Sequence, residues 1–278
     1  MRCVALLIAL LLSPVLHAEV EGRIEAGLGA FSLVQPNYRG SDHYHVLALP
    51  FPYLSYQSDK LRVSAEGANA KLFASDRLNL NISLSANFNS GKNDPPRTGM
   101  PKLVPTFEAG PSLDVKLWRS QDLTTRLRLR IPVRSVVATN ARQFSNIGWV
   151  FNPHFAATRR SILGDWYSVV SATVGPTFAT RNYNAYFYSV DSQFVTPERP
   201  GYQAKAGYGG SRVSLSWSLA RERWRFGVFG SAESLQGAVF ERSPLVETKR
   251  VLGAGLFINY RLYQNKPQRE ISEADAVE

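Results

Sequence analysis

Residues 78 to 89 alternate between apolar and polar side chains without a break. The even positions are apolar: Leu78, Leu80, Ile82, Leu84, Ala86 and Phe88. The odd positions hold only asparagine and serine: Asn79, Asn81, Ser83, Ser85, Asn87 and Asn89. Because successive side chains of a β-strand point to opposite faces, this pattern predicts a strand with one apolar and one polar face. A tilted strand of this length can cross a bilayer, so we expect lipid on one face and a wet interior on the other.

The first eighteen residues indicate export. Arg2 is followed by an apolar stretch over residues 3–16 and by Ala18 at the expected cleavage position, the pattern of a secretory signal peptide over residues 1–18. Cys3, the one cysteine of the chain, falls within this segment, so no disulfide is expected. No later segment approaches 18 consecutive apolar residues, which argues against helical membrane spans. A soluble periplasmic protein and an outer-membrane barrel remain.

The same alternation recurs along the chain in eleven segments. These are residues 22–34, 44–56, 61–73, 78–89, 104–117, 123–137, 147–158, 166–180, 202–220, 224–234 and 251–262. Bacterial barrels of one chain normally have an even number of strands, so we expect twelve, with ten as the alternative. The ambiguous segment is 202–220, where the apolar residues change from even to odd positions across Gly209 and Gly210. It is either one strand with a bulge or two short strands.

These observations predict an all-β fold, a transmembrane antiparallel up-and-down β-barrel over residues 19–263. Residues 264–278 are polar and acidic, and we expect them to form a flexible periplasmic tail. Connections alternate between short and long, as periplasmic turns and extracellular loops do. Trp118, Trp166 and Trp224 fall beside short connections and Trp149 beside a long one, which is typical of the two membrane interfaces.

A ladder of arginines indicates which face is inside. In segment 123–137, leucine, isoleucine and valine alternate with Arg126, Arg128, Arg130 and Arg134. An arginine facing lipid at mid-depth costs about 2–4 kcal/mol, so these side chains are expected to face the lumen. Glu108 and Asp114 share the polar face of the preceding segment, and cross-strand ion pairs follow as an expectation. Such a charge network either fills the barrel interior or lines a path for anionic solutes.

The sequence offers no catalytic constellation. Of the four histidines, His43 and His45 could share a metal, but no third ligand is indicated, and His154 falls on a polar strand face. No nucleophile with a neighbouring base, phosphate-binding loop or nucleic-acid motif is recognisable. We therefore expect a non-enzymatic protein without cofactor, metal or nucleic-acid partner. The net charge of +10 favours contact with the anionic phosphates of outer-membrane lipids.

Several stretches, in their order and spacing, resemble the MltA-interacting protein (MipA/OmpV) family of outer-membrane proteins. They are residues 38–42 with 47–50 and Tyr53, residues 184–190 with 201–207, and residues 243–246 before the closing segment 253–260. The resemblance implies an outer-membrane scaffold that holds a murein lytic transglycosylase near a murein synthase, without catalytic residues of its own. Other members of the family are treated as surface antigens or adhesins.

Three functional hypotheses result. The leading one is a scaffold for murein-remodelling machinery in the outer membrane of a Gram-negative bacterium. The second is a small channel for anionic solutes, motivated by the arginine ladder. The third is surface interaction or adhesion through the long loops at 90–102 and 181–201, because exposed loops commonly carry recognition.

Overall fold

The computed structural model describes residues 23–58, 61–64, 67–75, 77–89, 94–140 and 143–265. The expected signal peptide over residues 1–18 and the expected tail beyond Asn265 lie outside these residues, and both stay predictions. No helix among the described residues is long and apolar enough to span a membrane.

Thirteen strands make up the sheet of the described residues. They are β1 (Arg23–Pro36), β2 (Tyr44–Gln57), β3 (Leu61–Ser64), β4 (Gly67–Ala74), β5 (Leu78–Asn87), β6 (Thr106–Arg119), β7 (Thr125–Thr139), β8 (Phe144–Phe151), β9 (His154–Leu163), β10 (Trp166–Ala179), β11 (Gly207–Arg221), β12 (Trp224–Ser234) and β13 (Arg250–Gln264). The helical elements are η1 (Pro95–Arg97), α2 (Arg181–Tyr188) and η2 (Ser192–Phe194).

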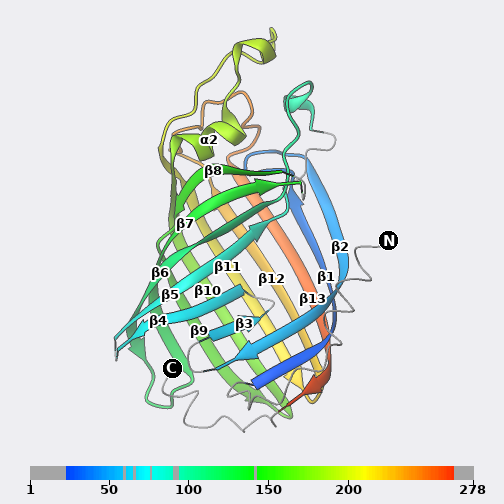
Figure 1. Cartoon of the computed structure of the whole chain (residues 1–278), viewed down its shortest axis with the longest axis vertical. Helices are drawn as coiled ribbons and strands as arrows, with labels where there is room; N and C mark the ends of the chain where they lie inside the picture. The colour runs from blue at the N-terminus through cyan, green and yellow to red at the C-terminus, as the bar shows by residue number, and fades with distance from the viewer. Residues whose placement is uncertain are drawn as a thin grey trace.

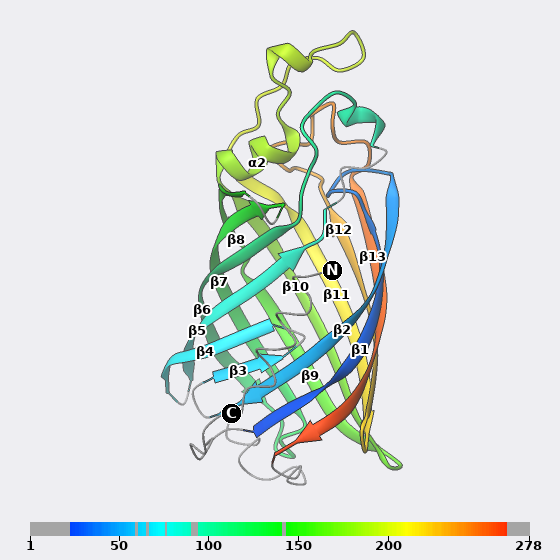
Figure 2. The same cartoon turned by 45° about the vertical axis from the view of Figure 1, so that its right-hand side comes forward.

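The sheet closes on itself. Each pairing is antiparallel, β1 pairs with both β2 and β13, and β10 pairs with β11, so the ring is complete. Figures 1 and 2 show the resulting barrel, with its strands tilted to the long axis. A closed barrel leaves no sheet edge along its seam and satisfies backbone groups between strands, which is what a bilayer requires.

The thirteen strands occupy twelve positions in the wall. β8 and β9 both pair with β7 and with β10, so they are one strand interrupted at Asn152 and Pro153. Proline lacks the N–H that a strand ladder needs, which explains the break. The expected twelve positions are therefore confirmed, within the described residues.

The twelfth strand does not come from the segment that the sequence left ambiguous. Residues 207–221 form the single strand β11, and Gly209 and Gly210 together lie opposite Thr177 of β10 between the pairs Phe178–Tyr208 and Pro176–Ser211. This is a β-bulge, and Gly210 takes the left-handed φ of +105° that a bulge glycine permits. The additional strand arises where segment 61–73 divides into β3 and β4, which pair as a hairpin.

Burial in the barrel is reversed relative to a soluble domain. On β6, Glu108 and Asp114 are 5% and 7% exposed, whereas Phe107, on the opposite face of the strand, is 51% exposed. Asn79 and Asn81 of β5 are likewise buried, while Leu78, Ile82 and Leu84 are exposed. The polar faces enclose the lumen and the apolar faces form the outer surface. A transmembrane barrel, as the alternation predicted, is the result.

The two ends of the barrel differ. Short connections at 120–124, 164–165 and 222–223 lie at the end where β1 begins and β13 finishes, with Glu25 opposite Gln264. Trp118, Trp166 and Trp224 lie in the terminal residues of their strands at this end, where Trp224 stacks on Phe226. The long loops and α2 gather at the opposite end (Figures 1 and 2). Bacterial barrels place short turns in the periplasm, so the long loops are extracellular.

Candidate functional site

The hydrophobic core of the described residues is formed by the extracellular loops together with the adjoining ends of wall strands, among them β7 and β8. Residues 37–43, 88–89, 94–105, 180–206 and 235–249 form a structure at the outer end of the barrel, which we call the cap. The five largest of its side chains that are less than 2% exposed are Tyr38, Tyr188, Phe240, Leu235 and Leu245. Tyr188 of α2 stacks on Phe240 with ring centroids 3.7 Å apart and planes 8° apart. Close packing of this kind fixes the loops against one another.

Buried hydroxyl groups and the Arg97 guanidinium connect the four loops. The Tyr38 hydroxyl donates to the carbonyl oxygen of Leu245 at 2.5 Å, and the Tyr188 hydroxyl donates to that of Arg39 at 2.9 Å. The Arg97 guanidinium donates to the carbonyl oxygen of Phe187 at 2.7 Å. Burial raises the pKa of Tyr38 and of Tyr188 above the ordinary range. Both hydroxyls therefore remain protonated donors at physiological pH.

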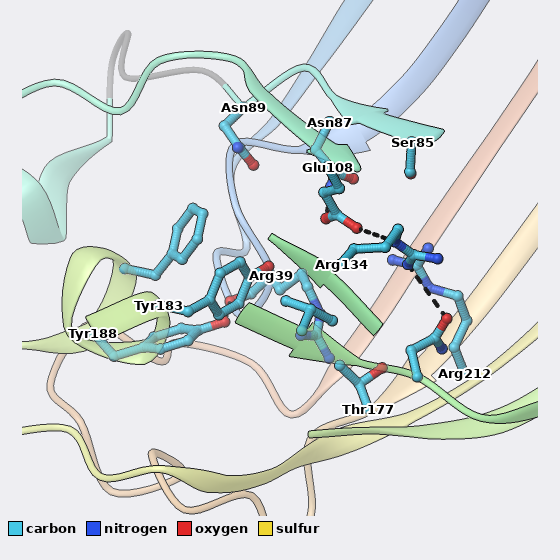
Figure 3. Close-up of a pocket in the computed structure, with 13 residues that line it drawn as sticks. Arg39, Ser85, Asn87, Asn89, Glu108, Arg134, Thr177, Tyr183, Tyr188 and Arg212 are labelled. Carbon is cyan, nitrogen blue, oxygen red and sulfur yellow. Dashed lines mark hydrogen bonds and ion pairs between the residues drawn. The ribbon is translucent and has the colours of Figure 1, made fainter. Parts of the chain in front are cut away.

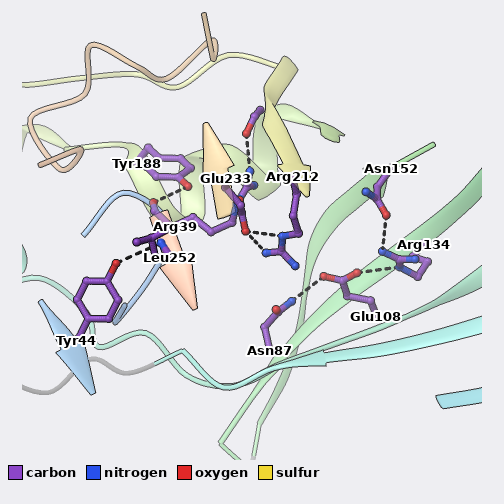
Figure 4. Close-up of polar contacts among 11 residues, drawn as sticks. Arg39, Tyr44, Asn87, Glu108, Arg134, Asn152, Tyr188, Arg212, Glu233 and Leu252 are labelled. Atoms are coloured by element: carbon purple, nitrogen blue, oxygen red, sulfur yellow. Dashed lines mark hydrogen bonds and ion pairs between the residues drawn. The ribbon is translucent and has the colours of Figure 1, made fainter. Parts of the chain in front are cut away.

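A charged cluster lies directly beneath the cap. Arg39 Nε, from the first loop, donates to Glu233 Oε2 on β12 at 2.6 Å, and Arg212 of β11 also pairs with Glu233 (Figure 4). Arg39 donates further to the carbonyl oxygen of Gly209 at 2.6 Å. Burial would lower the pKa of Arg39, but the Glu233 carboxylate outweighs burial and the pKa is raised, so the guanidinium stays charged. Two cations thus share one carboxylate, which is itself 3% exposed.

A second charged cluster faces the first across the lumen (Figure 4). Arg134 Nε of β7 donates to Glu108 Oε2 of β6 at 2.8 Å, and Asn87 of β5 donates to Glu108 Oε1 at 2.9 Å. Arg134 Nη2 also lies 3.5 Å from the Asn152 side-chain oxygen. The carboxylate is satisfied from two strands, as a buried charge requires.

The other residues of the expected arginine ladder lie further from the cap. Arg130 Nε is 3.5 Å from Asp114 Oδ2 on the neighbouring strand. The strand register places Arg128 opposite Lys116 and Arg126 opposite Arg119, not opposite a carboxylate. The structure thus brings together Arg134 with Glu108 and Arg130 with Asp114.

Two cavities lie at this level of the lumen. The smaller, of about 90 Å³, is bounded by Arg39, Tyr183 and Tyr188 from the cap and by Glu108 and Arg134 from the wall (Figure 3). Burial raises the pKa of Tyr183 to about 12, so its hydroxyl is neutral there. The larger cavity, of about 310 Å³, extends along β1, β10, β11, β12 and β13 and includes Arg39, Arg212 and Glu233 in its lining. Each of the two cavities is therefore lined by side chains of both the cap and the wall.

Sequence reasoning did not identify Arg39, Arg212 or Glu233 as site residues. Arg212 begins the polar face that continues through Ser214, Ser216 and Ser218, and that alternation could have shown it. Arg39 lies in a loop with no periodicity. Its contact with Glu233 joins residues 194 positions apart in the chain, which no local pattern reveals.

The histidines occupy separate environments. His43 Nε2 lies 3.3 Å from Asp42 Oδ1 and 3.5 Å from Glu247 Oε1 on the surface of the cap. His45 instead lies 3.1 Å from the side-chain oxygen of Asn37, and His154 Nδ1 lies 2.9 Å from the carbonyl oxygen of Asn152. The possible pairing of His43 with His45 is thus replaced by an exposed cluster of His43 with two carboxylates.

Three solved structures of outer-membrane proteins are similar to this chain at low sequence identity. A bacterial polysaccharide outer membrane secretin has 10% identity over 86% of this chain and 99% of that chain, with a TM-score of 0.41. The NanC porin has 9% identity over 87% and 99%, with a TM-score of 0.37. The outer membrane protease OmpT from Escherichia coli has 9% identity over 87% and 96%, with a TM-score of 0.31. Likeness at this level supports no transfer of function. No curated protein matches the chain.

A family sequence model matches most of the chain. The sequence model of the MltA-interacting protein MipA matches residues 27–262, from the first strand to the last. The match includes the loops that build the cap as well as the strands of the wall. This chain therefore belongs to the MipA family of MltA-interacting proteins.

Proposed function

We propose that the protein is a non-enzymatic scaffold in the outer membrane of a Gram-negative bacterium, and that its periplasmic face holds murein-remodelling enzymes. The observation that carries this proposal is the cap, whose packed core lies across the outer end of the barrel. A barrel with its outer end occupied in this way is better suited to holding a partner than to passing solutes. The family to which the chain belongs is described by its interaction with MltA, which supports a partner in cell-wall turnover.

The periplasmic turns would offer such a partner a surface that is already ordered. Thr124 Oγ1 donates to Asp122 Oδ2 at 2.9 Å and Ser120 donates to the same carboxylate, so one turn is held by its own side chains. These hydrogen bonds, that of Ser120 first, lower the pKa of Asp122, and the group stays ionised. Arg221 pairs with Asp165 at 3.1 Å and connects two neighbouring turns. A surface ordered before binding loses less entropy when it binds.

Binding between purified components tests the proposal. The mature barrel in lipid nanodiscs is immobilised, and a purified murein lytic transglycosylase is passed over it in biolayer interferometry. We expect saturable binding that weakens about tenfold or more in the turn variant Leu123→Asp/Arg223→Glu. Leu123 is 41% exposed with a φ of +62°, and aspartate tolerates that conformation, so the turn should be retained. The matched control is Gln236→Lys on the exposed cap surface, which should bind like the wild type.

Two results would contradict a periplasmic scaffold. One is the absence of binding to the wild-type barrel under conditions where the transglycosylase is active. The other is that Gln236→Lys in the cap loses binding while the turn variant Leu123→Asp/Arg223→Glu binds like the wild type. That result would place the interaction on the extracellular side and favour the surface-interaction hypothesis.

A second candidate function is an anion channel, and the arginine ladder favours it. Arg126, Arg128 and Arg130 lie on the lumenal face of β7, and Lys116 lies opposite Arg128. A cationic lining attracts anions and repels cations. Conductance across a planar lipid bilayer separates the two functions. A barrel that is silent with its cap intact is consistent with a scaffold, whereas anion-selective current through the native barrel would establish the channel.

A further inference from the structure

The larger cavity beneath the cap has two chemically different sides. Leu33 of β1, Phe229 of β12 and Val251 of β13 form an apolar side. Serine and threonine hydroxyls of β10 and β11 lie along another part of the lining, and Arg39, Arg212 and Glu233 provide its charges. At about 310 Å³ the cavity falls at the lower end of the range of small-molecule sites.

The apolar side belongs to an aromatic wall that the sequence builds with glycine. Register places Gly255 opposite Phe229 and Gly29 opposite Phe51 across neighbouring strands. A Cβ added to Gly255 would lie 2.4 Å from Phe229 Cζ, and one added to Gly29 would lie 2.7 Å from Phe51 Cζ. Each ring therefore rests directly on a backbone that has no side chain. Glycine at these positions allows phenylalanine rings to line the lumen over β12, β13, β1 and β2.

The charged side has one more cation than anion. Arg39 and Arg212 both pair with Glu233, and these three are the charged residues of the cavity lining in the described part of the chain. The Arg39 side chain is 19% exposed, whereas that of Arg212 is 44% exposed and retains free surface toward the cavity. Glu233 cannot neutralise both guanidiniums. A carboxylate is the anion that matches the flat donor geometry of arginine.

We propose that this cavity binds a small amphipathic carboxylate, with its head group on Arg212 and its apolar body against Leu33 and Phe229. The binding site is independent of the scaffold function, because it lies in the lumen and not on the periplasmic turns. A neutral molecule with the same body would gain only the apolar contact, and a short carboxylate such as acetate would gain only the ionic one.

Isothermal titration calorimetry with 4-phenylbutyrate tests the site. The full mature chain is placed in nanodiscs of phosphatidylcholine, and the neutral 4-phenylbutanamide and acetate serve as matched probes. We expect 4-phenylbutyrate to bind about tenfold or more tightly than either, since one hydrogen bond to a charged group is worth at least that factor. Equal affinity for the acid and the amide would overturn the assignment of Arg212, and no binding of 4-phenylbutyrate would overturn the site.

Variants assign the two halves of the cavity. Arg212→Gln should weaken 4-phenylbutyrate about tenfold and leave 4-phenylbutanamide unchanged, whereas Phe229→Ala should weaken both. Arg242→Gln removes the same charge from the exposed surface of the cap and should change neither. Arg212→Lys keeps the charge without the planar donors and should retain part of the affinity, which separates charge from loss of folding. If Arg212→Gln and Arg242→Gln behave alike, the proposed head-group contact is wrong.

Discussion

At the scale of single residues, the cap depends on buried hydrogen bonds that few alternatives could replace. Tyr38 is 1% exposed, and its hydroxyl satisfies the carbonyl oxygen of Leu245 from a loop more than 200 residues away in sequence. Both groups are shielded from water, so loss of the donor leaves a buried acceptor unpaired. Such contacts define one arrangement of the loops rather than a general collapse.

The variant Tyr38→Phe tests that dependence. It should lower the free energy of opening of the cap by about 1–3 kcal/mol, the usual cost of an unpaired buried polar group. Hydrogen exchange of peptides from residues 235–249 measures the change. Tyr263→Phe, at an exposed position at the end of β13, is the control and should leave exchange unaltered. Equal exchange in both variants would show that the Tyr38 hydroxyl does not hold the loop.

Glu233 connects the cap to the wall, and its substitution should affect hydrogen exchange in other segments than Tyr38→Phe does. Glu233→Gln leaves Arg39 without the carboxylate that compensates its burial. Loss of one partner of a buried ion pair typically costs about 3–5 kcal/mol, and the lower end applies because Arg212 already faces the lumen. We expect faster hydrogen exchange in residues 37–43 and 207–211. Glu241→Gln breaks an ion pair with Lys249 at the surface and should have little effect, so equal effects of the two variants would refute the role of Glu233.

At the scale of elements, two glycines of neighbouring strands differ in how much space a side chain would find. Gly255 and Gly230 lie on the neighbouring strands β13 and β12. A Cβ at Gly255 would meet Phe229 at 2.4 Å and the Ser32 carbonyl oxygen at 2.6 Å, whereas a Cβ at Gly230 would meet its nearest neighbour at 3.6 Å. Close neighbours therefore exclude a side chain at Gly255, whereas there is room for one at Gly230.

Alanine substitutions measure this difference. Gly255→Ala should destabilise the barrel by about 1–3 kcal/mol, because the backbone of β1 cannot move away without disturbing its pairing. Gly230→Ala should be neutral or slightly stabilising, since alanine reduces the freedom of the unfolded chain. The temperature at which the folded band disappears in semi-native gel electrophoresis reports both. A similar loss of stability in Gly230→Ala would show that glycine is needed for another reason.

The strands could be predicted because each carries its own signal. Alternation over residues 104–117 and 123–137 indicated both strands and their lumenal faces, and so put Glu108 and Arg134 on the same side of the wall, where the structure pairs them. The shift of the alternation at Gly209 and Gly210 was also visible in the sequence, but it left a bulge and a pair of short strands both open, and the strand pairing identifies the bulge. The division of segment 61–73 into β3 and β4 was missed, although its apolar residues change from odd positions (Leu61, Val63, Ala65) to even positions (Ala68, Ala70, Leu72).

At the scale of the whole molecule, the protein removes apolar side chains from water in two different ways. The barrel wall places its apolar side chains outward, while the cap buries Tyr38, Tyr188 and Phe240 in a core of its own. The cap core joins segments far apart in sequence, and apart from the short helix α2 these have neither helical nor strand period, so their packing against one another could not be deduced from local patterns. For the same reason the contact between Arg39 and Glu233 escaped prediction, although the lumenal face of each strand did not.

Removal of part of the cap should convert the barrel into an anion channel. Replacement of residues 181–206 by a short glycine–serine linker deletes α2, and with it Tyr183 and Tyr188, which bound the cavity at the outer end. The wall strands β10 and β11 still pair directly, so the barrel itself should persist. In planar bilayers we expect conductance at least about tenfold above that of the native chain, with preference for chloride over potassium because the lumen then presents its arginines to solvent.

Charge substitution in the opened barrel identifies the residues responsible for selectivity. Arg126→Gln/Arg128→Gln/Arg130→Gln should keep the conductance and reduce the preference for anions, since these side chains share the lumenal face of β7. The matched control is Arg159→Gln/Arg223→Gln/Arg250→Gln. It removes three arginines that do not lie on the lumenal face of β7. A silent opened barrel would mean that the lumen is also obstructed below the cap. Unchanged selectivity in the triple variant would mean that the arginine ladder neutralises charge within the wall and does not face a path for ions.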